Sequence, residues 1–90
     1  MKQADIDRLR LRLEIRPVLA KVALMLLANT GRVVEYSALK RVTAHPIPQV
    51  LRLRSALRDW DAPGRIQNLS RRGYAMDQDL ANWLTDLLKD

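Results

Sequence analysis

Residues 49–74 place the strongest constraints on what this chain can fold into. Pro48 suits the first turn of a helix, because its missing N–H is not needed there and its φ is already helical. Apolar side chains then recur at the helical period as Val50, Leu53, Leu57 and Trp60. The dipeptide Pro63-Gly64 has turn chemistry and ends the helix. The stretch therefore predicts an amphipathic helix with one anchored face and one outward face.

The residues after this turn predict a β-hairpin. Residues 65–69 and 74–76 are short runs with β-branched or aromatic members. Between them, Ser70-Arg71-Arg72-Gly73 has the composition of a turn, in which we expect Gly73 to supply a positive φ. Two arginines would then lie at the hairpin tip.

The stretch before residue 49 predicts two helices and a strand. Residues 18–29 are apolar almost all round the helix axis, so this helix must be covered on more than one side. Gly31 suits the left-handed position that ends it. Residues 32–34 predict a short strand that pairs with the hairpin. Residues 36–43 predict a short helix with Lys40 and Arg41 facing outward.

Three motifs along the chain carry a family resemblance. They are Gly31-Arg32-Val33-Val34, Arg52-Leu53-Arg54-x-x-Leu57 and Ile66-x-x-Leu69-x-x-x-Gly73-Tyr74. In order and approximate spacing, they resemble the winged-helix effector domain of OmpR/PhoB-type response regulators over residues 15–76. Pro17 also stands where that family often has a proline. The resemblance covers no receiver domain, and neither a receiver domain nor most of the family's N-terminal sheet fits in the remaining residues.

The resemblance implies an α+β fold that is mainly helical. It is a winged helix-turn-helix, with a three-helix core and a C-terminal β-hairpin wing, plus an extra C-terminal helix. We expect one domain over residues 1–90, with an N-terminal arm or strand at 1–16, the winged-helix core at 17–76 and the added helix at 77–90. Asp77 is a credible N-cap for that last helix.

The two ends of the chain leave alternatives open. Residues 6–16 alternate apolar and charged side chains as a strand does, although Ile6, Leu9 and Leu13 also suit a helix. The resemblance favours a strand near the end of this segment. The C-terminal helix has an apolar stripe that either packs back on the helix at residues 18–29 or forms a homodimer; its members are Leu80, Trp83, Leu84 and Leu87.

Composition bounds the function. The net charge is +6, and residues 1–76 hold 15 of the 16 basic residues but only 6 of the 10 acidic ones, which suggests a polyanionic partner. With no cysteine and one histidine, His45, we expect no metal, cofactor or small-molecule site and no enzymatic activity. Because no window suits a membrane span or a signal peptide, we expect a cytoplasmic protein without a membrane partner.

These observations predict sequence-specific binding to double-stranded DNA by a stand-alone transcriptional regulator. A short regulator of this kind is typical of small repressors and of phage or mobile-element proteins. Arg52 is the first choice for a base contact in the major groove, with Ser55 and Arg58 on the same side of the helix and Leu51 able to meet a thymine methyl group. The predicted interface consists of Gln49, Leu51, Arg52, Arg54, Ser55, Arg58, Lys40, Arg41, Arg71 and Arg72.

Within this interface, the resemblance gives the groove contact to Arg52 and a phosphate contact to Arg54. An alternative for Arg54 and Arg58 is a salt bridge to Asp59, Asp61 or Glu35. The wing departs from the family, since Ser70 precedes Arg71 at the tip and the positive charge has moved along the chain. Arg71 and Arg72 remain suited to a narrow minor groove.

A protein–protein adaptor or inhibitor on the same scaffold is the rival reading. It predicts that Arg52, Arg71 and Arg72 are occupied by internal ion pairs, while Leu51 and Trp83 form an exposed patch. DNA binding instead predicts that the three arginines face solvent in one plane.

Overall fold

The fold is α+β and mainly helical, as predicted. The structure is a computed structural model that describes residues 1–69 and 71–89. Ser70, expected in the hairpin turn, and Asp90, at the end of the last segment, lie outside the described residues. The elements in order are α1 (Gln3–Leu13), α2 (Pro17–Ala28), β1 (Val34–Glu35), α3 (Tyr36–Leu39), α4 (Pro46–Asp59), β2 (Ile66–Leu69), β3 (Gly73–Met76) and α5 (Gln78–Leu88).

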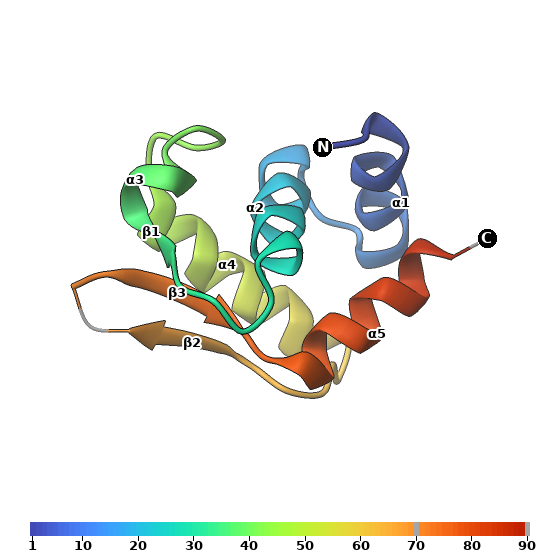
Figure 1. The fold of residues 1–90 in the computed structure, drawn as a ribbon. Coiled ribbons are helices and arrows are strands. Elements are labelled where there is room, and N and C mark those ends of the chain that lie inside the picture. The colour runs from blue at the N-terminus through green and yellow to red at the C-terminus, as the bar shows by residue number, and fades with distance from the viewer. Residues whose placement is uncertain (70, 90) are drawn as a thin grey trace.

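The three strands form one antiparallel sheet in the order β1-β3-β2 (Figure 1). The central strand places Tyr74 opposite both Val34 of β1 and Asn68 of β2. The predicted hairpin is therefore confirmed. The short strand pairs with it as expected, but at Val34–Glu35 instead of residues 32–34. This pairing ties the hairpin to the chain that leaves α2.

The helix α2 is the centre of the core. Pro17 stands in its first turn, where its missing N–H leaves no bond unmade, and Gly31 follows its end with a φ of 77°. Both α1 and α4 pack against it, which covers its apolar surface from more than one side. No helix in residues 1–69 and 71–89 is long and apolar enough to cross a membrane.

The N-terminal segment is the helix α1, so the strand that the resemblance favoured is wrong and the helical alternative for Ile6, Leu9 and Leu13 is confirmed. Three of its side chains are almost completely buried: Ile6 is 4% exposed, Leu9 0% and Leu13 2%. Leu11, which a strand would place on the same face as Leu9 and Leu13, is 79% exposed. Helical spacing explains this pattern, because it gathers positions 6, 9 and 13 against α2 and turns position 11 outward.

The helix α5 packs within the chain, against α1 (Figure 1). Asp77 is its N-cap, as predicted, and accepts a hydrogen bond of 3.0 Å from the backbone N–H of Leu80. At its other end, Arg12 donates to the carbonyl oxygens of Leu87 and Lys89, and Arg8 to that of Leu88. These arginines satisfy carbonyls that the end of a helix leaves unpaired.

This packing buries much of the predicted apolar stripe of α5 within the single chain. Leu80 and Leu84 are buried in the single chain, and Trp83 and Leu87 are partly buried against the core. Only the latter two thus keep surface that a second copy could contact. The sequence left open whether this helix packs on α2 or forms a homodimer, and in the structure α1 is its main contact.

Two helix boundaries also differ from the prediction. The helix α3 ends at Leu39 instead of residue 43, and the chain continues in turns in which Arg41 N–H donates to the Ala38 carbonyl at 3.1 Å. The helix α4 begins at Pro46, two residues before Pro48, with His45 as N-cap. Both prolines fit, because the first helical turn needs no backbone N–H donors.

Candidate nucleic-acid interface

The helix α4 has the predicted division into a buried and an exposed face. Val50 and Leu53 are completely buried and Leu57 is 5% exposed. On the opposite side, Arg52, Ser55 and Arg58 are exposed, Gln49 is partly exposed, and Leu51 is 51% exposed. The helix is thus anchored along one stripe and presents a mixed basic and apolar face to solvent.

The sequence predicted that Trp60 continues the buried stripe, but this side chain is 45% exposed. The helix has already ended at Asp59, so residue 60 no longer follows the helical period. Its indole Nε1 donates a hydrogen bond of 3.0 Å to the carbonyl oxygen of Leu13. Trp60 therefore joins the end of α4 to the end of α1.

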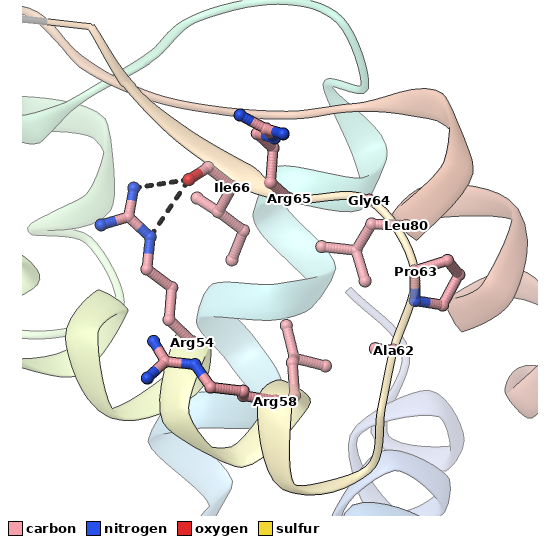
Figure 2. A pocket seen from close by; sticks show the side chains of 9 residues that line it. Arg54, Arg58, Ala62, Pro63, Gly64, Arg65, Ile66 and Leu80 are labelled. Carbon is pink, nitrogen blue, oxygen red and sulfur yellow. Dashed lines mark hydrogen bonds between the residues drawn. The ribbon is translucent and has the colours of Figure 1, made fainter.

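The Arg54 side chain makes its contacts within the protein, to β2 and β3. Its Nε donates to the carbonyl oxygen of Ile66 at 3.1 Å, and a terminal nitrogen donates to the same oxygen (Figure 2). Its guanidinium carbon also lies 5.5 Å from the centre of the Tyr74 ring, within reach of a cation–π interaction. Arg54 thus fastens α4 to the hairpin, and neither of the predicted phosphate and salt-bridge roles describes these contacts.

The Tyr74 ring, which lies next to the Arg54 guanidinium, is buried and packs edge-on against Tyr36. Tyr74 is 1% exposed, and its ring centre lies 5.6 Å from that of Tyr36. Burial raises the pKa of the Tyr74 phenol above its ordinary value, Tyr36 raises it further and Arg54 lowers it. At neutral pH the guanidinium therefore faces a neutral ring.

Arg52 and Arg58 make no hydrogen bond or ion pair with any described residue. The salt bridges to Asp59, Asp61 or Glu35 that were the alternative for Arg54 and Arg58 are not formed in the described part of the chain. Arg52 lies at a depression of about 430 Å³ that is also lined by Gln49 and by Arg16 from the α1–α2 connection. Sequence reasoning did not select Arg16, which only this packing brings beside α4.

The hairpin presents two arginines, but with a different turn geometry from the predicted one. Arg71 and Arg72 are exposed, and Arg71, not Gly73, has the positive φ, 62°. Gly73 is buried in β3, where a Cβ atom would collide with the carbonyl oxygen of Val34 in β1. The glycine is therefore required by the close approach of two strands and not by the turn.

Lys40 and Arg41 are exposed just after α3. Figure 1 shows α3 on the same side of the molecule as the start of β3. Two hydrogen bonds connect these parts. The backbone N–H of Tyr36 donates to the Arg72 carbonyl at 3.2 Å, and the Tyr36 hydroxyl contacts the Asn68 side chain at 3.4 Å. His45 is exposed just before α4.

Sequence reasoning also missed Ile47 and Arg65. Ile47 is 49% exposed, one helical turn before Leu51 on the same side of α4, and the helical spacing signals this pair once the start of α4 is known. Arg65 is exposed at the start of the hairpin and lines a cavity together with Arg54 and Arg58. Its charge was visible in the sequence, but its neighbours were not.

Comparison with protein-family models, curated proteins and solved structures finds no significant match to this chain. The resemblance to OmpR/PhoB-type effector domains therefore rests on the three motifs and Pro17. Among the described residues, no group of three or more His, Cys, Asp and Glu side chains is arranged to hold a metal ion.

Proposed function

We propose that this chain is a winged helix-turn-helix protein that binds double-stranded DNA in the cytoplasm and regulates transcription. The order α2-β1-α3-α4-β2-β3 and the strand order β1-β3-β2 support this proposal, because they match the order of elements that the resemblance implies. In this arrangement α3 and α4 form the helix-turn-helix, and β2 and β3 form the wing.

The exposed, unpaired Arg52 on α4 is the observation that carries the proposal. A helix is about 10–12 Å across and fits a major groove about 12 Å wide. Arg52 projects from the side opposite the buried stripe and has no carboxylate partner among the described residues. Its guanidinium is free to donate two hydrogen bonds to a guanine edge, with Ser55 and Leu51 on the same exposed surface.

The remaining basic residues suit contacts to the DNA backbone. Lys40 and Arg41 follow the first helix of the motif, and Arg71 and Arg72 lie on the wing, all exposed. Such contacts fix the orientation of a protein on the duplex without reading its sequence. In this account Arg54 acts mainly by holding α4 on the sheet.

The adaptor reading has one observation in its favour, the exposed apolar pair Ile47 and Leu51 on α4. DNA binding is favoured over it for two reasons. Arg52, Arg71 and Arg72 are exposed and form no ion pair with the described residues. Trp83, which the adaptor reading needs on the surface, is partly buried against the core.

Arg52→Ala should weaken binding to a selected operator by about 1–3 kcal/mol and relax specificity at one base pair.

Arg71→Ala should weaken binding more uniformly across sequences, since the minor groove offers a degenerate pattern. Fluorescence anisotropy with the operator and with single-base variants measures both effects. Arg10→Ala is the control, because Arg10 is on α1 and its ion pair in the described part of the chain is with Asp7, at 3.7 Å. Unchanged affinity in both Arg52→Ala and Arg71→Ala would rule out the proposed interface.

A further inference from the structure

A basic cavity lies between the second half of α4 and the start of the hairpin. It has a volume of about 220 Å³. Its lining combines three arginines with apolar side chains, and Figure 2 shows them around the chain that runs from α4 into β2. The arginines are Arg54 and Arg58 from α4 and Arg65 from the segment before β2. Buried Leu57, Ile66 and Leu80 contribute to the lining.

Two of these arginines form no ion pair in the described chain. Arg58 and Arg65 are exposed, and neither side chain makes an ion pair or hydrogen bond with a described residue. Like charges on one small cavity repel each other, so an unpaired arrangement is most favourable when an anion occupies it.

The carboxylate of Asp77, close to this turn, is held by backbone N–H groups and forms no ion pair with an arginine of the described chain. One oxygen accepts the backbone N–H of Arg65 at 2.9 Å, and the other accepts the N–H of Leu80 at 3.0 Å. Gly64 makes this approach possible, since a Cβ atom at its position would collide with the Asp77 carboxylate. Asp77 therefore holds the backbone of Arg65 while the Arg65 guanidinium extends from the cavity wall without a partner in the described chain.

Arg54 gives the cavity a fixed wall. Its bonds to the Ile66 carbonyl are drawn in Figure 2. Together with its position over the Tyr74 ring, they hold the guanidinium in place before any ligand arrives. An arginine has five N–H donors, and Arg54 uses only two of its nitrogens on Ile66. A charge that is already immobilised loses less conformational entropy when an anion binds.

We propose that the cavity formed by Arg54, Arg58 and Arg65 binds a phosphodiester group of duplex DNA, with Arg58 and Arg65 as the contacting residues and Arg54 as a positioning residue. This inference rests on the proposed DNA-binding function and extends its interface along α4, beyond the residues around Arg52. Planar guanidinium groups suit phosphate oxygens because they donate paired hydrogen bonds. A free phosphate ion offers the same oxygens, so the test must separate the two sources.

The test measures how DNA affinity depends on salt for the wild type and for Arg65→Gln. Each phosphate contact contributes a slope of about −0.9 to the plot of log K against log salt concentration. Arg65→Gln should therefore make the slope shallower by about one unit and weaken binding equally for all sequences. Arg10→Gln, which removes the same charge from α1, should leave the slope unchanged. Circular dichroism should show the same unfolding transition for all three proteins, because the Arg65 side chain makes no bond within the described chain.

Each outcome bears on a different step of the inference. A wild-type slope retained in Arg65→Gln would overturn the phosphodiester site while leaving the proposed function intact. Absence of DNA binding by the wild type would overturn both. If inorganic phosphate shifts the NMR signals of the Arg58 and Arg65 side chains but Arg65→Gln keeps the wild-type slope, the cavity binds a free oxyanion and its assignment to a DNA phosphodiester is wrong.

Discussion

Replacing Leu9 with alanine should lower the free energy of unfolding by about 2–5 kcal/mol, the usual range for truncating a buried leucine. Leu9 is completely buried where α1 packs against α2, so the truncation leaves a cavity at the centre of the helical core. Leu11→Ala is the matched control. Leu11 is 79% exposed on the same helix, and its replacement should change stability by less than about 0.5 kcal/mol.

Urea denaturation followed by circular dichroism measures both variants. The comparison tests whether α1 is a helix or a strand. A strand would place Leu9 and Leu11 on one face, so the two substitutions would lower the free energy of unfolding by similar amounts. A large loss in Leu9→Ala with no loss in Leu11→Ala supports the helix. Equal losses in the two variants would contradict it.

Gly73→Ala should destabilise the protein by at least about 2–3 kcal/mol, at the upper end of the range for overpacking. The added methyl group would meet the backbone of Val34 and Glu35 in β1, and backbone cannot move aside as the end of a flexible side chain can. The loss of stability should be largest where β1 pairs with β3. The amide of Tyr36, which donates to the Arg72 carbonyl, should lose protection from hydrogen exchange.

Gly31→Ala separates this steric effect from a general cost of replacing glycine. Gly31 has a φ of 77°, but a Cβ atom there meets nothing within 4 Å. Its replacement should therefore cost only about 1–2 kcal/mol, the penalty of a left-handed conformation, and leave the Tyr36 amide protected. If Gly31→Ala proves the more damaging of the two, the close approach of β1 and β3 is not what requires glycine at position 73.

The features predicted correctly from the sequence are those that depend on local patterns. The buried stripe of Val50, Leu53 and Leu57 follows from helical spacing, and the Asp77 cap from the preference of a carboxylate for unpaired N–H groups. The hairpin is similarly local. In each case the residues that cause the structure lie within a few positions of one another.

The features that sequence reasoning missed depend on partners that are distant in the chain. Arg54 bonds to Ile66, 12 residues away, and Arg12 bonds to carbonyls 75 and 77 residues away. Residues 6–16 carried both a strand and a helix period, and only packing against α2 selected the helix. For the same reason, the grouping of Arg65 with Arg54 and Arg58 could not be predicted from residue types alone.

The salt dependence of binding to random-sequence duplex DNA decides whether this protein binds DNA. Fluorescence anisotropy between about 50 and 200 mM salt covers the range in which phosphate contacts change affinity strongly. We predict binding at the low-salt end that weakens steeply as salt is added. No binding even at the lowest salt concentration would contradict the proposal, and the exposed Ile47–Leu51 surface of α4 would then become the place to look for a protein partner.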